Sequence, residues 1–220
     1  MLSHSQRHAA VPSKVCSLRM KWRAITAVVA TALLFGSNSG TALGAISIAG
    51  DVSVSTSNPN SQAIIGNQAF GSIQIDGGSL LTTGQITIAQ SQAGIGFATV
   101  TGAGSRWSFT GTADIGVSGV GRFDVLNGAV VSQSQFGTFR IATQSNGHGT
   151  VRVEGLGSLL QVSDQLLIGG NLSQGLLQIA NGALVNVPFD FTQNAVQGRI
   201  EFAGGTLRTI QLINHGVVAG

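Results

Sequence analysis

The stretch VTGAGSRWSF, Val100–Phe109, decides the fold because its frame returns further along the chain. At Val153–Val162 the sequence reads VEGLGSLLQV, with the same Val-x-Gly-x-Gly-Ser order fifty-three residues later. After the serine of the first copy, polar and apolar residues alternate, which is the period of a β-strand and places Trp107 and Phe109 on one side. A frame that returns with different residues in it predicts a structural repeat rather than a loop with one function.

Three series of short apolar runs recur around these two frames. In the first, an isoleucine precedes glycine or alanine; the second has a single Ile or Val; the third follows a glycine-rich turn. The first series is Ile65-Gly66, Ile88-Ala89, Ile115-Gly116, Ile141-Ala142 and Ile168-Gly169; the second is Ile75, Val100, Val125, Val153 and Ile179; the third is Leu80-Leu81, Trp107 with Phe109, Val130-Val131, Leu160 with Val162, and Leu184-Val185. One unit of about 26 residues therefore holds three short strands and three turns, without a helical period.

Alternate units share a turn. DGGSLL (76–81), LNGAVV (126–131) and ANGALV (180–185) form one type, and the two Gly-x-Gly-Ser frames form the other, so the period of the sequence is a pair of units. Glycine suits such corners because left-handed backbone angles cost it little, and we expect Ser105 to tie its own turn. The predicted turn glycines are Gly102, Gly104, Gly128, Gly155, Gly157 and Gly182.

A unit of three short strands cannot bury its apolar face alone. Stacked units would place each strand beside its equivalent at about 4.8 Å, in parallel ladders around one continuous core. We therefore predict an all-β chain, folded as a right-handed parallel β-helix of about six to seven coils with three short strands per coil. The repeats cover residues 62–220, after an N-terminal cap or lead-in at 45–61. An antiparallel sandwich is the competing all-β fold, but it would not explain why units two apart match best.

The repeat loosens after Asn186. We expect FDF (189–191) to form the first strand of the next unit, RIEFAGGTL (199–207) the second strand and turn, and 209–220 to begin another unit. The last coil is thus predicted to be incomplete. Because an uncapped solenoid exposes a strand edge, we expect either further sequence after Gly220 or a partner over this end.

Residues 1–44 are predicted to form a secretory signal peptide. A basic start precedes a twelve-residue apolar run at 24–35, which is shorter than the roughly 20 residues of a membrane span. The small residues of the predicted cleavage region are Ala42, Gly44 and Ala45. Met20 opens this segment cleanly, so we expect it to be the initiator. The mature chain would then be exported and would meet a membrane only during export.

The formal net charge of +3 comes from this leader. From Ala45 onward, six arginines face eight acids and lysine is absent, so no nucleic-acid partner is expected. The only cysteine, Cys16, lies in the leader, and the mature chain is therefore expected to have neither a disulfide nor a thiolate.

Other candidate site residues have structural explanations. His148 and His215 lie in separate loops without a second histidine at ligand spacing, so we predict no metal site and no cofactor site. GVSGVG (116–121) is interpreted as a corner between strands rather than a phosphate cradle. Trp107 and Phe109 could form a platform for a sugar ring, but strand alternation favours the core.

Two aspartates align with arginines of the following unit. Asp114 shares its column with Arg140, and Asp124 shares its column with Arg152. We predict two cross-coil ion pairs, each contributing roughly 0–1 kcal/mol. The alternative is a catalytic face, since enzymes that cleave polysaccharides need several carboxylates in one groove. The carboxylates that would have to converge are Asp114, Asp124, Glu154 and Asp164.

The segment from Val100 to Ser132 resembles the passenger repeats of bacterial autotransporters, whose units read roughly V-x-G-x-G-S-x-W … L-x-V-G … G-x-L-x-[IV]-x-[ND]-G-G-x-V. The matching residues are Val100, Gly102, Gly104, Ser105, Trp107, Ile115-Gly116, Phe123, Val125, Asn127 and Gly128. Similar repeats occur in exported bacterial surface proteins with a Pro-Glu-Pro sorting tail, and FAGGTLRTIQLINHG (202–216) is similar to their final units. The resemblance covers roughly residues 62–215.

This resemblance implies an exported structural or adhesive protein of the cell surface, the outer membrane or the extracellular space. It implies a stalk without a catalytic site, whose partners would be carbohydrate, matrix or another cell surface. We also expect a C-terminal translocator or sorting partner, which these 220 residues do not include. The alternative function is that of a polysaccharide-active β-helix enzyme, of the lyase or hydrolase kind.

Overall fold

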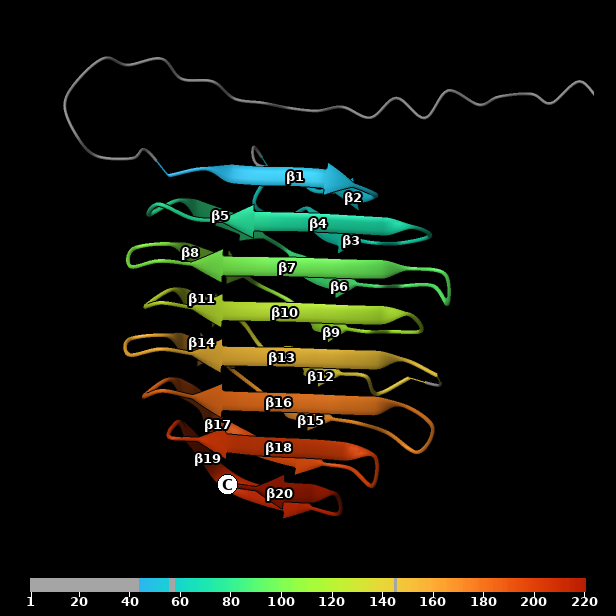
Figure 1. Cartoon of the computed structure of the whole chain (residues 1–220), viewed down its shortest axis with the longest axis vertical. Coiled ribbons are helices and arrows are strands. Elements are labelled where there is room, and N and C mark those ends of the chain that lie inside the picture. Colours follow the sequence, from blue (N-terminus) through green and yellow to red (C-terminus); the bar gives the residue numbers. More distant parts are fainter. Residues whose placement is uncertain (1–43, 56–57, 145) are drawn as a thin grey trace, which may run out of the picture.

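The strands stack into a parallel β-solenoid of about six turns (Figure 1). The computed structural model describes residues 44–55, 58–144 and 146–220, in which every regular element is a strand. The predicted all-β parallel solenoid is thereby confirmed. Residues 1–43 of the predicted signal peptide, including Met20 and Ala42, lie outside the described residues. In the part of the chain that the structure describes, no helix could span a membrane.

One sheet contains the second strand of every coil. Its order is β1-β4-β7-β10-β13-β16-β18-β20, and all neighbours from β4 onward are parallel. These strands are β1 Ile46–Gly50, β4 Phe70–Ile75, β7 Ile95–Thr101, β10 Val120–Leu126, β13 His148–Glu154, β16 Gln174–Ala180, β18 Gly198–Ala203 and β20 Val217–Ala219.

The other sheet has twelve strands and contains the first and third strands of the coils. The first strands are β3 Gln62–Ile65, β6 Gln85–Ile88, β9 Ala113–Ile115, β12 Phe139–Ile141 and β15 Leu166–Ile168, with β2 Val52–Ser53 at their edge. The third strands are β5 Leu80–Thr83, β8 Arg106–Phe109, β11 Val130–Gln133 and β14 Leu159–Gln161. Two long strands, β17 Leu184–Asn194 and β19 Thr206–Asn214, join both ladders in the last coils.

The long strand β17 corrects the predicted start of the sixth coil. Its residues 192–194 pair with β15, so Asn194 continues the column of Ile168. The prediction that 189–191 forms the first strand is wrong, because Phe189 is 71% exposed. The hydrophobic pattern did not predict this register, because the buried Asn194 occupies a position that is apolar in the other coils.

The core is continuous through the coils, because the pairing joins the members of each predicted series. Trp107 and Phe109 are fully buried. The rings of Trp107 and Phe123 lie edge to face with centroids 5.5 Å apart, and Phe123 stacks on Phe139 at 6.4 Å. Trp107 Nε1 donates a buried hydrogen bond of 3.0 Å to Thr83 Oγ1, which satisfies its only polar group.

Two kinds of turn alternate at the corner between the second and third strands. Asn127 and Gly128 have φ of +56° and +82°, and Ala129 N donates to Leu126 O at 3.1 Å, as in a type I′ turn. In the Gly-x-Gly-Ser turn Gly102–Ser105, the second residue, Ala103, has no positive φ, whereas the third, Gly104, has φ of +85°, as a type II turn requires. The six turn glycines have φ between +78° and +95°: Gly102, Gly104, Gly128, Gly155, Gly157 and Gly182.

The serine of one turn type binds the other type in the preceding coil. Ser158 Oγ accepts a hydrogen bond of 2.9 Å from Gly128 N, and Ser105 Oγ accepts one of 3.0 Å from Gly78 N. Ser105 also ties its own turn, as expected, because its backbone N–H donates to Gly102 O at 3.1 Å; the bond of its hydroxyl to the preceding coil was not expected. In both of these pairs of turns an Asn-Gly or Gly-Gly turn is followed by a serine-bearing turn, whereas the last turn of this type donates Gly182 N to Gly204 O at 2.8 Å. The bond between serine and glycine explains why the sequence repeats every two coils.

A column of six glycines inside the second strands was not predicted. The glycine column consists of Gly71, Gly96, Gly121, Gly149, Gly175 and Gly198. A Cβ atom on Gly149 would lie 2.4 Å from Ile115 O and 2.8 Å from Ala142 N, so the backbones of the first and second strands meet there in a contact that only glycine permits. Residues 116–119 of the predicted corner connect β9 to β10, while Val120 and Gly121 already belong to β10.

Reversed strands close the N-terminal end of the solenoid. β1 pairs with β4, and β2 with β3, in the antiparallel sense (Figure 1). Ala45, from the predicted cleavage region, donates its N–H to Asp76 Oδ1 at 3.1 Å, and Gly44 precedes it. The described chain therefore contacts the first coil at the last residue of the predicted cleavage region.

Candidate functional site

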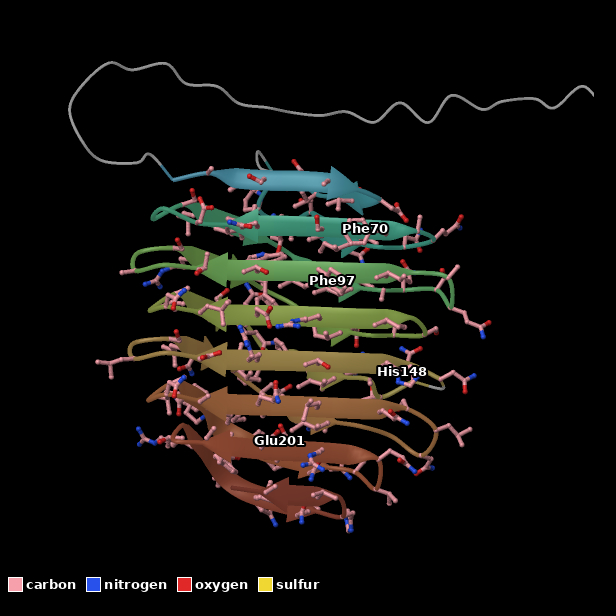
Figure 2. All side chains as sticks on the ribbon, in the orientation of Figure 1. Phe70, Phe97, His148 and Glu201 are labelled. Atoms are coloured by element: carbon pink, nitrogen blue, oxygen red, sulfur yellow. The ribbon has the colours of Figure 1, made fainter. Side chains whose placement is uncertain are left out.

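The outer face of the eight-stranded sheet gathers exposed aromatic, charged and polar side chains in columns (Figure 2). Side chains of a strand alternate between its two faces, so in-register strands stack equivalent positions along the solenoid. Two outward columns flank the glycine column, one on each side. The first contains Phe70, Ile95, Val120, His148 and Gln174; the second contains Ser72, Phe97, Arg122, Thr150, Leu176, Arg199 and Val217.

The N-terminal part of this face is apolar. Phe70, Ile95 and Val120 are 48%, 41% and 48% exposed, and they are neighbours in one column. The rings of Phe70 and Phe97 lie edge to face, with centroids 5.7 Å apart. A groove of about 180 Å³ beside Phe97 is also lined by Ser72 and residues of β1. The aromatic residues that sequence reasoning considered, Trp107 and Phe109, are thus in the core, while two other phenylalanines are on the surface.

A chain of ion pairs crosses the middle of the face. Arg122 Nε lies 2.8 Å from Asp124 Oδ2 on the same strand, and Arg152 Nε approaches the other carboxylate oxygen at 3.7 Å from the next coil. Arg152 Nη1 then lies 3.2 Å from Glu154 Oε2. Asp124 is the most buried member, with 10% of its side chain exposed. Sequence reasoning paired Asp124 with Arg152 and missed Arg122, although its spacing of two residues places it on the same face.

Two grooves lie toward the C-terminal end of the same face, and their linings differ in charge. We name the first the polar groove; it has a volume of about 380 Å³ and is lined by His148, Thr150, Gln174, Gln197 and Arg199, with three glycines and the apolar residues Leu176, Val196 and Val217. The second, of about 300 Å³, is lined by the acids Glu154 and Glu201 together with Arg152. Gln178 Nε2 donates to Glu201 Oε2 at 2.7 Å, and this bond and Arg199 lower the pKa of Glu201.

The two other candidate carboxylates, Asp114 and Asp164, do not lie on the eight-stranded sheet. Arg140 Nη1 lies 3.1 Å from Asp114 Oδ1, across the first-strand ladder of the other sheet. Burial raises the pKa of Asp114, and the charge of Arg140 opposes this without cancelling it. Asp164 lies between β14 and β15, so Asp114 and Asp164 do not share a groove with Asp124 and Glu154.

Asp164 has an acidic neighbour that the sequence did not predict. Partial loss of hydration and the carboxyl of Asp190, which also hydrogen-bonds to Asp164, raise the pKa of Asp164. Gln165 Nε2 donates to Asp190 Oδ2 at 3.3 Å. The long strand β17 brings Asp190 to this corner. The pair was not predicted because the register of β17 differs from the one expected from the sequence.

Asp164→Asn is expected to raise stability at neutral pH but not in acid. Because the folded-state pKa is raised, the contribution of Asp164 is most favourable below the ordinary aspartate pKa of about 3.9 and is lost as the pH rises through the raised value. Urea titrations of both proteins at pH 7 and pH 3 measure this. Asp190→Asn is the matched variant and should give the same relief. An equal gain at both pH values would contradict the assignment.

No group of three or more His, Cys, Asp or Glu side chains within 44–55, 58–144 and 146–220 could hold a metal ion. His148 lines the polar groove, and His215 lies between β19 and β20, so the structure does not bring the two histidines into one site.

Comparison with known proteins adds no family assignment. A scan against protein-family models, a search of the curated proteins and a search of the solved structures found no match to this chain. The autotransporter-like resemblance therefore rests on the turn and strand motifs, and the structure itself establishes the β-solenoid fold with its alternating corners.

Proposed function

We propose that this chain is an exported, passenger-like β-solenoid that acts as a stalk and adhesive surface at the cell exterior rather than as a catalyst. The observation that carries the proposal is that four of the eight acids after Ala45 form ion pairs with arginines of the strands. Asp114, Asp124, Glu154 and Glu201 each lie within 4 Å of an arginine, and they are spread over two sheets. Such pairs suit a stiff polar surface better than a site with free acid and base groups.

The resemblance to passenger repeats and to Pro-Glu-Pro-sorted surface proteins supports export, and the ladders support rigidity. The partner would be carbohydrate, matrix or another cell surface. These assignments rest on fold and motif, and a binding assay must establish them.

A glycan array combined with a reducing-sugar release assay tests this function. We expect the purified protein to retain glycans without releasing reducing ends. Release of reducing ends would contradict the proposal and favour the polysaccharide-active alternative.

The Asp164–Asp190 pair is the observation that favours this second candidate. A carboxyl of raised pKa is what glycoside hydrolysis uses as its general acid, and Asp190 contributes to that raised pKa of Asp164; the second carboxylate of such a site lies about 5–9.5 Å away, so Asp190 is too close to be that group. If sugar release is found, loss of that release in both Asp164→Asn and Asp190→Asn would assign it to this pair, whereas unchanged release would place it elsewhere.

A further inference from the structure

We propose that the polar groove binds a carboxylate-bearing linear polysaccharide, a uronan, with the chain running across the coils. This inference deepens the adhesive function proposed above and rests on it. The groove is open to the outer face of the eight-stranded sheet, and its lining residues come from β13, β16, β18, β20 and the loop before β18.

The groove lies between the two outward columns. The residues between these columns, Gly149, Gly175 and Gly198, face the interior, where an added Cβ would meet the carbonyl oxygens of the first strands, so the floor of the groove is backbone. The volume of about 380 Å³ lies within the range of roughly 300–1,000 Å³ that is typical of small-molecule sites. Because successive coils repeat the same positions, a ligand with a repeating backbone meets equivalent positions in adjacent coils.

The chemistry of the lining favours an acidic sugar. No aspartate or glutamate lines the polar groove, while its side-chain donors come from His148, Thr150, Gln174, Gln197 and Arg199. The adjoining groove is instead lined by Glu154 and Glu201. Two grooves on one face thus differ in charge, and a carboxylate would be accepted by the first and repelled by the second.

Arg199 is the principal contact for the carboxylate. Its Nε lies 2.5 Å from Glu201 Oε1, which fixes the direction of the guanidinium, and its side chain is 52% exposed. Within the described residues, no protein group accepts a hydrogen bond from its two terminal nitrogens. Those nitrogens can therefore bind a carboxylate, for which the planar guanidinium is well suited. Leu176, Val196 and Val217 supply apolar contact for the faces of sugar rings.

Isothermal titration with oligogalacturonate tests the inference, and its fully methyl-esterified form is the matched ligand without charge. We expect binding of the free acid and about tenfold or weaker binding of the ester. Arg199→Gln and Gln174→Glu should each weaken binding of the free acid by about tenfold. Gln174→Glu places a carboxylate in the groove without touching the Arg199–Glu201 pair.

Arg106→Gln is the control variant, since Arg106 lies on β8 of the other sheet and its loss changes the net charge equally. It should bind like the unmodified protein.

The inference would be overturned by equal binding of acid and ester, by preferential binding of dextran sulfate, by absence of binding, or by equal weakening of binding in Arg106→Gln. Retention of neutral glycans alone on the array would overturn it and leave the adhesive function standing. Hydrolysis of the bound oligomer would instead retain the site and overturn the adhesive function.

Discussion

Gly149→Ala is expected to lower the free energy of unfolding by about 3 kcal/mol or more. The new Cβ atom would lie 2.4 Å from Ile115 O and 2.8 Å from Ala142 N. Both are backbone atoms held in parallel ladders, so no side chain can rotate to make room. The first and second strands would have to separate at this coil, and the ladders above and below would resist that movement. Chemical denaturation followed by circular dichroism measures the loss.

Gly157→Ala is the matched control for this experiment. Gly157 has φ of +82°, but the nearest heavy atom to an added Cβ is Gly128 Cα at 3.6 Å. The Gly157→Ala variant should therefore lose stability only because alanine must adopt the left-handed backbone conformation, which costs an L-residue roughly 1–2 kcal/mol. If the two variants lose the same stability, the close backbone contact at the glycine column is not the determinant.

Gln133→Leu is expected to lower the free energy of unfolding by about 3 kcal/mol or more. Gln133 is 3% exposed, and its amide serves three coils. Its Nε2 donates to Gly111 O at 2.8 Å and to Gly137 O, and its Oε1 accepts from Ser163 N at 3.0 Å. Leucine has a similar volume and cannot make these bonds, so three partly buried backbone groups lose their partners at a cost of about 1 kcal/mol or more each.

Gln161→Leu provides the comparison. Gln161 also lies in the third-strand ladder but is directed outward, and its Oε1 accepts one bond, from Asn186 Nδ2 at 2.8 Å. Its replacement should cost no more than about 1 kcal/mol, since solvent can replace the lost partner. A loss at Gln133 as small as that at Gln161 would show that the three backbone groups find other partners.

The coil register could be predicted because every core position repeats at nearly constant spacing. Ile65, Ile88 and Ile115 align in sequence for the same reason that they stack in space. Prediction ended where a polar residue took a core position, as at Gln133 and Asn194. Hydrophobic periodicity does not distinguish such residues from surface residues, since their burial depends on partners from other coils.

The candidate site was harder to predict than the fold for a related reason. The neighbours Asp114–Arg140 and Asp124–Arg152 follow directly from the register. The polar groove instead depends on which outward side chains of β13, β16, β18 and β20 meet beside the loop before β18, in the coils where the repeat loosens. Phe70 and Phe97 occupy outward positions that also alternate with period two, but nothing in the alternation marks their rings as neighbours.

The alternation of corners also sets how the molecule can change its length. Removal of one coil would stack two corners of the same kind and leave a glycine N–H without its serine, or a serine without its glycine. Removal or duplication of two coils would restore every such bond. The smallest interchangeable module of this solenoid is therefore the pair of coils, and one-coil gains or losses must be accompanied by a rebuilt corner.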